Sequence, residues 1–281
     1  MTTRVGRIAI ILAAVAIANA GVPAPAAAAV PAPAHVVIVV EENHSSAGVV
    51  GNKSAPYLNS LAAGGALMTQ SYAVTHPSEP NYLALFAGNT FGLGSDACPV
   101  NGGAAPNLAA ELLAAGYTFT GFAEDLPSVG STACSAGHYA RKHTPWVNFT
   151  NVPAACSVPF SSFNARTDFS SLPTVSFVIP NLVNDMHDGT IGQADSWLYT
   201  NLAHYANWAT ANNSLLIVTW DEDDDSANNQ IPTIFYGGPV KPGTYGEPVS
   251  HYNVLSTVEQ IYGLPKTGLA AEAPPIADIW A

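Results

Sequence analysis

The 281-residue sequence has few positive charges, and their scarcity excludes one large class of partners. It contains 8 Lys+Arg against 20 Asp+Glu, and its formal net charge at pH 7 is -12. A protein that binds nucleic acid needs a basic surface, so nucleic acid is not an expected partner. The same acidic balance repels an anionic substrate at long range, so a bound cation, most simply a metal, would have to reverse the sign at its site.

The amino-terminal apolar run is too short to cross a membrane. Ile8–Ala18 has 11 residues, whereas a membrane-spanning helix needs about 20. Arg4 and Arg7 precede the run, and small residues at 18–20 and 26–29 follow it. This three-part pattern predicts a signal peptide over residues 1–29 and secretion of the rest. The alternative is a membrane anchor.

Cysteine is also scarce, and the chain has only Cys98, Cys134 and Cys156. None of them has the ligand spacing of a zinc site. In an exported protein, three cysteines predict one disulfide and one unpaired thiol. Spacing alone does not fix the pairing, and Cys98–Cys134 is the pairing that we expect.

The remaining chain is long enough for one sizeable domain. A Pro/Ala linker at residues 30–34 precedes about 245 residues, 35–281, which can bury a full core. No repeat or second linker divides them, and no basic amphipathic helix favours stable membrane insertion. We expect a monomer.

Apolar strands alternate with helices along this domain, which favours an α/β fold with a mostly parallel central sheet covered by helices on both faces. The expected strands are Val36–Val40, Tyr117–Phe122, Val175–Ile179, Ser214–Trp220 and Ile231–Tyr236. The expected helices are Ala55–Gly64, Asn81–Ala87, Pro106–Ala115, Ala194–Ala211 and Ser250–Tyr262.

Acids and amides follow three of the expected strands. Because ligands bind outside the carboxyl ends of parallel strands, we expect these side chains to form a site. Their oxygen atoms suit Ca, Mg, Mn or Zn as ligands. The residues are Glu42 with Asn43, Asn181 with Asp185, and Asp221 with Glu222.

The acidic run continues through Asp223, Asp224 and Asp225, which we expect in a solvated loop. An EF-hand would need Gly at the sixth position and Glu at the twelfth. Counted from Asp221, those positions hold Ser226 and Pro232, so the run does not match an EF-hand.

Ser78 lies between two prolines at the expected start of a helix. Serine there is ordinarily an N-cap. The alternative is a nucleophile, because a helix amino end favours a bound phosphate and a metal can lower the hydroxyl pKa. Asn81, one turn later, could then donate to a phosphoryl oxygen.

Two histidines lie in polar loops that flank expected strand ends. They are His187 and His251, each of which could serve as a metal ligand, a phosphate donor or a general acid for the leaving group.

Together these segments resemble a known family. Five motifs in this order are similar to those of the bacterial phosphoesterase family that joins acid phosphatases and phospholipases C, within the alkaline-phosphatase-like superfamily. The motifs are VIVVEENH (37–44), THPSEPNY (75–82), PNLVNDMHDG (180–189), TWDED (219–223) and SHYNVL (250–255).

The resemblance implies a role for each candidate residue. It places one divalent metal on Glu42, Asn43, Asp221 and Glu222 and makes Ser78 the nucleophile. His187 and His251 correspond to histidines around the phosphate, with Asp185 beside them. The short spacing from Asp185 to His187 departs from two-metal members, so we expect a single ion.

The activity implied is hydrolysis of phosphomonoesters with acid preference, through a phosphoserine at Ser78. A further expectation concerns Arg141 and Lys142, which lie in the one compact basic group. They could contact the headgroup of a phosphoinositide lipid or simply form a solvated surface. Alternatives are a phospholipase C-type phosphodiesterase and, in another class, a secreted calcium-binding or adhesion module.

Overall fold

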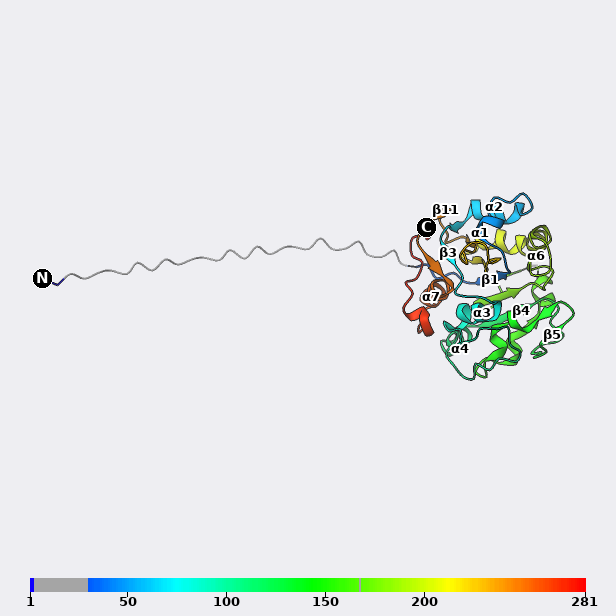
Figure 1. Ribbon diagram of the computed structural model, residues 1–281. Coiled ribbons are helices and arrows are strands. Elements are labelled where there is room, and N and C mark those ends of the chain that lie inside the picture. Colours follow the sequence, from blue (N-terminus) through cyan, green and yellow to red (C-terminus); the bar gives the residue numbers. More distant parts are fainter. Residues whose placement is uncertain (3–29, 167) are drawn as a thin grey trace.

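The computed structural model describes residues 1–2, 30–166 and 168–281. Nearly all of the predicted signal peptide therefore lies outside the described residues. Within them the chain folds around an eight-stranded sheet (Figure 1). In sheet order the strands are β11 (Gly243–Tyr245), β2 (Ala66–Met68), β10 (Thr233–Gly237), β9 (Leu215–Trp220), β1 (Val36–Glu41), β8 (Val175–Ile179), β4 (Phe119–Ala123) and β7 (Ser157–Pro159).

Most neighbouring strands run parallel. The strands from β9 through β1, β8 and β4 to β7 are parallel, whereas β10 is antiparallel to both β9 and β2. The predicted α/β fold with a mostly parallel sheet is confirmed. The sequence did not predict β2, β7 and β11, because each has three residues and so carries too little periodicity to detect.

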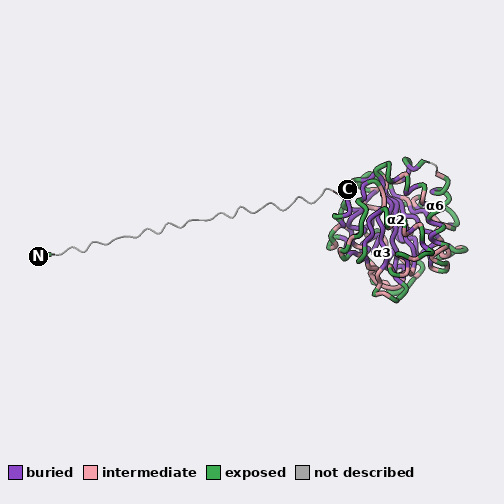
Figure 2. Tube along the Cα trace, turned by 90° about the horizontal axis from the view of Figure 1, so that it is seen from above, coloured by how far each residue is buried: buried purple, intermediate pink, exposed green. Residues whose placement is uncertain are grey.

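Helices cover both faces of the sheet. Figure 1 shows α2 (Pro56–Gly64) and α6 (Ile191–Ala211) on one side of β1, and α3 (Ser78–Ala87) with α4 (Leu108–Ala114) on the other. A third helix, α7 (His251–Ile261), shares the apolar cluster of α3. Buried residues fill the middle of the molecule and exposed residues its periphery (Figure 2).

Alternation along β1 divides the core between these two layers. Val36, Ile38 and Val40 belong to the apolar cluster of α3 and α7, while Val37 and Val39 belong to that of α2 and α6. Successive side chains of a strand point to opposite faces, so a buried strand must be apolar throughout.

Two helices begin earlier than predicted. Thr190 and Gln193 form a capping box, which starts α6 at Ile191. The nucleophile candidate Ser78 is the first residue of α3, whose N-cap is Pro77 and whose cap has no side-chain hydrogen bond. The N-cap interpretation of Ser78 is therefore wrong.

The remaining elements are short. They are α1 (Ser46–Val49), β3 (Ser71–Tyr72), β5 (Ser135–Ala136), β6 (Tyr139–Ala140), η1 (Arg141–His143), η2 (Pro145–Asn148), η3 (Ala154–Cys156), α5 (Ser161–Asn164), β12 (Val249–Ser250) and η4 (Gly268–Ala271). Among the described residues, no helix combines the length and apolar character needed to cross a bilayer.

The structure confirms the expected disulfide. Cys98 and Cys134 are bonded, with 5.8 Å between their Cα atoms. Cys156 is a free, partly buried cysteine.

Replacement of Gly121 tests the packing of β4 against η2. A Cβ atom at this position would overlap the indole ring of Trp146, which is fully buried and has little room to move. We expect Gly121→Ala to lower the free energy of unfolding by about 1–3 kcal/mol, as overpacking usually does. Urea denaturation measures the loss. Gly94→Ala is the matched control, because nothing lies within 4 Å of its Cβ position, and equal losses in the two variants would contradict the packing argument.

The pH dependence of stability tests Glu259, a fully buried residue of α7. Burial, opposed by hydrogen bonds from Thr267, raises the pKa of Glu259 from 4.5 to about 7. The folded state thus binds this proton more tightly than the unfolded state. The stability that this proton contributes is fully present below pH 4.5 and is lost as the pH rises through about 7. The total loss in the free energy of unfolding is at most about 3 kcal/mol.

In Glu259→Gln the carbonyl oxygen can still accept from Thr267, but the side chain no longer titrates. Thermal unfolding of both proteins from pH 4.5 to 8 should show the variant gaining on the wild type with rising pH. A constant difference between the two across this range would refute the buried-proton assignment.

Candidate active site

The hydroxyl of Ser78 lies between two carboxylates from different strand ends. Its Oγ is 3.1 Å from Oε2 of Glu42 and 3.3 Å from Oε1 of Glu222, and either oxygen can accept its one O–H proton. The side chain is only 2% exposed. Segments near residues 42, 78 and 222 of the chain therefore meet at one point.

The alternation of β1 sends two consecutive acids to opposite faces. Glu42 continues the Val36–Ile38–Val40 side, where α3 carries Ser78. Glu41 faces the α6 side, is fully buried, and neither of its carboxyl oxygens has a hydrogen-bond partner among the described residues. Burial, together with the charges of Asp185 and Glu42, raises the pKa of Glu41 well above its usual value, which favours its neutral form in the core.

A second strand end is tied to the first through Asp221. Its Oδ1 accepts the backbone N–H of Asn43 at 3.2 Å and that of Glu222 at 2.6 Å. Its Oδ2 is buried and has no hydrogen-bond partner among the described residues. This oxygen is free to bind a cation.

The electrostatics of the carboxyl cluster also favour a bound cation. Burial raises the pKa of Asp221 well above its usual value, and the charges of Glu42 and Glu222 add to the rise. Burial also raises the pKa of Glu222 to about 7, against the opposing charge of His76. Clustered carboxylates that repel one another are stabilised by a bound cation. The predicted ligands Glu42, Asp221 and Glu222 thus fit a hard metal ion by donor type.

His143 lies on the other side of Glu42. Its Nε2 is 3.0 Å from Oε1 of Glu42, and its Nδ1 is 3.3 Å from Oδ2 of Asp185. The imidazole stacks on the ring of Tyr82, whose hydroxyl donates to Glu42 at 2.7 Å. Glu42, His143 and Asp185 also form a group close enough to share a metal ion.

His143 and Glu42 stabilise each other's charges. Burial lowers the pKa of His143, but the charges of Glu42 and Asp185 overcome this and raise it to about 9. Burial raises the pKa of Glu42, yet His143 and the bonds from His143 and Tyr82 lower it to about 2. These mutual shifts favour an imidazolium at His143 beside the carboxylate of Glu42.

His76 contacts the cluster from the solvent side. Its Nδ1 is 2.8 Å from Oε2 of Glu222, and its Nε2 is 3.3 Å from Oδ1 of Asp223. Asp223 is buried, and it accepts the backbone N–H groups of Asp225, Ala227 and Asn229. The expectation that Asp223 is solvated is therefore wrong, although Asp224 and Asp225 are exposed as expected.

Lys142 brings a positive charge to Ser78. Its Nζ lies 3.5 Å from Oγ of Ser78, 3.3 Å from Nε2 of His187 and 2.8 Å from Oδ2 of Asp96. His187 is itself held by Asp188, which lies 2.8 Å from Nδ1, and by a backbone bond to Asp185. The structure thus brings Lys142 and His187 together beside the nucleophile candidate.

Two predicted site residues have mainly structural contacts. The amide oxygen of Asn81 accepts from Val74 and Thr75, and its nitrogen donates to Thr75, so Asn81 fixes the loop before Ser78. His251 is buried, and its Nε2 lies 2.9 Å from the carbonyl of Trp220 at the end of β9. Burial lowers the pKa of His251 to about 4. A phosphate contact for either residue stays a prediction.

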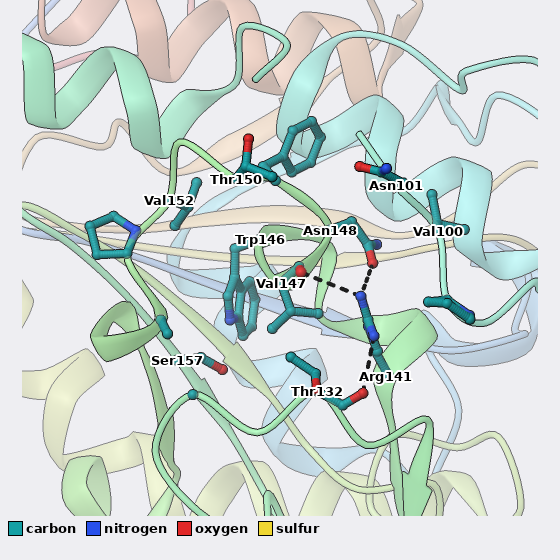
Figure 3. Close-up of a pocket in the computed structure, with 15 residues that line it drawn as sticks. Val100, Asn101, Thr132, Arg141, Trp146, Val147, Asn148, Thr150, Val152 and Ser157 are labelled. Atoms are coloured by element: carbon teal, nitrogen blue, oxygen red, sulfur yellow. Dashed lines mark hydrogen bonds between the residues drawn. The ribbon is translucent and has the colours of Figure 1, made fainter. Parts of the chain in front are cut away.

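Arg141 points away from its neighbour Lys142. Figure 3 shows its guanidinium reaching Thr132, Val147 and Asn148 on the wall of a cavity, whose volume is about 450 Å³. Asn148 in turn lies 3.4 Å from Oε1 of Glu79. Arg141 thus contacts the cavity wall, whereas Lys142 contacts Ser78, His187 and Asp96.

Sequence reasoning missed four residues of the site. His76 and Tyr82 stand inside the second motif and could have been suspected from it. His143 and Asp96 lie outside all five motifs, and only the fold places them beside Glu42 and Lys142.

Comparison with known proteins identifies the family of the chain. A profile described as that of the phosphoesterase family matches residues 52–265. The chain belongs to the phosphoesterase family. Membership confirms the predicted family, and the phosphatase relatives confirm the predicted enzyme class, a hydrolase acting on phosphoric monoester bonds.

Two similar proteins are phosphatases. A phosphatidylinositol-3-phosphatase of Mycobacterium tuberculosis is 72% identical over 246 residues, which are 88% of this chain and 82% of that protein. An acid phosphatase of Aspergillus fumigatus is 33% identical over 230 residues, 74% of this chain and 51% of that protein. The chain thus spans about half the length of this fungal relative.

Solved structures are similar in fold. The lipoteichoic acid synthase LtaP from Listeria monocytogenes has a TM-score of 0.59 at 12% identity, over 85% of this chain and 74% of that one. A protein in the alkaline phosphatase superfamily from Vibrio parahaemolyticus has a TM-score of 0.57 at 14% identity, over 87% and 71%. These likenesses confirm the alkaline-phosphatase-like fold.

Proposed function

We propose that the chain is a secreted, metal-assisted acid phosphatase that hydrolyses phosphomonoesters, phosphatidylinositol 3-phosphate among them, through a phosphoserine at Ser78. The observation that carries the proposal is the position of the Ser78 hydroxyl between Glu42 and Glu222, with the Lys142 ammonium 3.5 Å away. The pattern of residues 1–29 supports secretion.

One divalent metal would be held by Glu42, Asn43, Asp221 and Glu222. The unpartnered Oδ2 of Asp221 and the raised pKa values of Asp221 and Glu222 support this assignment. When bound, the ion lowers the pKa of the serine hydroxyl and neutralises charge on a phosphoryl oxygen. The donor set does not select among Mg, Ca, Mn and Zn.

Ser78 would attack the phosphorus in line with the leaving oxygen. Its hydroxyl is pinned by two carboxylates at the amino end of a buried helix, so the nucleophile is oriented before the substrate arrives. The helix amino end and Lys142 favour the negative charge of the phosphoryl group. Water then hydrolyses the phosphoserine.

The departing alkoxide needs a proton, and His187 is the candidate donor. Its Nε2 lies 3.3 Å from Lys142, and Asp188 orients its other nitrogen. The oriented imidazole can act as a general acid once its Nε2, which faces Lys142, carries a proton.

The name and 72% identity of the mycobacterial relative support a phosphoinositide substrate. For such a lipid, Lys142 would contact the transferred phosphate. Arg141, which points toward the cavity of Figure 3, would contact another part of the headgroup only if the ligand reached that cavity.

Two other functions follow from the same residues. A phospholipase C-type phosphodiesterase would use the same Ser78 and metal but release diacylglycerol from an intact phospholipid. A calcium-binding or adhesion module would use the carboxylates alone. The contacts of Ser78 with Lys142, and of Lys142 with His187, favour an enzyme over a binding module. The names of the phosphatase relatives favour the phosphatase over the phosphodiesterase.

The nucleophile is tested with purified wild type and Ser78→Ala on p-nitrophenyl phosphate and phosphatidylinositol 3-phosphate, with and without a chelator. We expect the variant to lose at least about 10³-fold in kcat, because no nucleophile replaces the hydroxyl. Chelation should lower the wild-type rate, and restored metal should recover it. Diacylglycerol from whole phospholipid, with no phosphate from either ester, would establish the phosphodiesterase instead.

The leaving-group role predicts that His187→Ala depends on the ester. A poor leaving group such as an alkyl phosphate needs the proton and should slow by about 10²-fold, whereas p-nitrophenyl phosphate should slow far less. Steady-state kinetics on both esters measures the ratio. Equal slowing of the two esters would remove His187 from this role.

A further inference from the structure

The position of Lys142 depends on one other charged side chain. A lysine ammonium sits on a flexible four-carbon stem and does not orient itself. The Nζ contacts Ser78 and His187 at 3.5 and 3.3 Å, but its short ion pair, 2.8 Å, is with Asp96. Side-chain exposures of 18% for Lys142 and 28% for Asp96 shield the pair in part from water.

The second oxygen of Asp96 reaches the helix of the nucleophile. Its Oδ1 accepts the backbone N–H of Glu79 at 2.9 Å. Glu79 directly follows Ser78 in the first turn of α3, where the N-cap Pro77 gives no side-chain acceptor. Asp96 thus satisfies an unpaired N–H at the helix start. One carboxylate joins the nucleophile's helix to the lysine that faces it.

Asp96 lies where secondary structure does not hold it. Residues 88–107, between α3 and α4, form no helix or strand. Backbone hydrogen bonds tie Gly88, Gly102 and Gly103 of this stretch to other segments. Nearer to Asp96, the chain is tethered by the disulfide from Cys98, two residues beyond Asp96, to Cys134. Both cysteines are exposed, so the bond contributes little burial and acts mainly as a covalent constraint.

The other end of the disulfide holds the segment of Lys142. The carbonyl of Cys134 accepts the backbone N–H of Arg141 at 3.0 Å. The short antiparallel pair of Ser135 with Ala140 closes the same turn. The two cysteines are therefore attached to the two partners of the ion pair, Asp96 on one side and Lys142 on the other.

We propose that Asp96 is a positioning residue that holds the Lys142 ammonium at the Ser78 hydroxyl, and that the Cys98–Cys134 disulfide keeps Asp96 in place. The inference rests on the proposed function, because Lys142 has a catalytic task only if Ser78 receives a phosphoryl group. Asp96 itself does not touch the substrate. It fixes the distance between the nucleophile's helix and the cation.

The main test is Asp96→Asn in the full-length enzyme. Asparagine keeps an acceptor for the Glu79 N–H and removes the charge that holds Lys142. We expect kcat on p-nitrophenyl phosphate to fall about tenfold while KM changes by less than about threefold, since a misplaced cation costs transition-state more than ground-state stabilisation. Inhibition by vanadate, which mimics the transferring phosphoryl group, should weaken by a similar factor, with little change for inorganic phosphate.

The disulfide gives an independent arm. Cys98→Ser combined with Cys134→Ser should reproduce the kcat loss of Asp96→Asn. Adding Asp96→Asn to the double serine variant should cost less than about threefold more, because all three changes act through one contact and are not additive. Matched controls are Cys156→Ser for removal of a thiol and Asp168→Asn, whose carboxylate bonds Ser170, for removal of a charge.

The Lys142→Met variant distinguishes failure of the proposed function from failure of the positioning role of Asp96. Full activity of that variant would refute the role of Lys142 in the proposed function. A large loss in Lys142→Met, with unchanged kcat and vanadate inhibition in Asp96→Asn and in the double serine variant, would overturn the positioning role alone. Thermal unfolding of every variant identifies misfolding, and a lower Tm with a normal kcat would mark Asp96 as merely structural.

Discussion

The site depends on balancing buried negative charge at the strand ends. Glu42, Asp221, Glu222 and Asp185 are all buried, and the charge of Glu42 acts on each of the other three. Isolated charges in such a place would be too costly to keep. The His143 imidazolium offsets Glu42 and Asp185 from within the fold. The rest of the excess charge favours protons at low pH or a bound cation, which connects the folding energetics to the chemistry that the family performs.

The same constraint explains which parts of the site were predictable. The strands β1, β8 and β9 are continuous apolar runs that end in acids or amides, so their position and the meeting of Glu42 with Asp221 and Glu222 follow from sequence pattern. The Cys98–Cys134 pairing was expected and is present. The roles expected for His187, His251 and Asn81 depend on a bound phosphate and stay predictions.

Other parts depended on contacts that no local pattern encodes. Asp223 looks like one more acid in an exposed run, yet it is buried and accepts hydrogen bonds from three backbone N–H groups. Arg141 and Lys142 are neighbours in sequence but diverge in the 3-10 helix η1, one toward a cavity and one toward Ser78. Asp96 sits in a stretch without periodicity, so only the folded chain relates it to α3.

The opposite orientation of Glu41 and Glu42 also bears on how such a chain can diverge. Because β1 alternates strictly between two apolar layers, inserting or deleting one residue within it would exchange the environments of the two acids. The carboxyl group that contacts Ser78 would then turn into the apolar layer beneath α6, where the oxygens of Glu41 have no hydrogen-bond partner among the described residues. Length variation among relatives is thus expected in irregular stretches such as residues 88–107. The number of residues from the start of the first strand to Glu42 should stay constant.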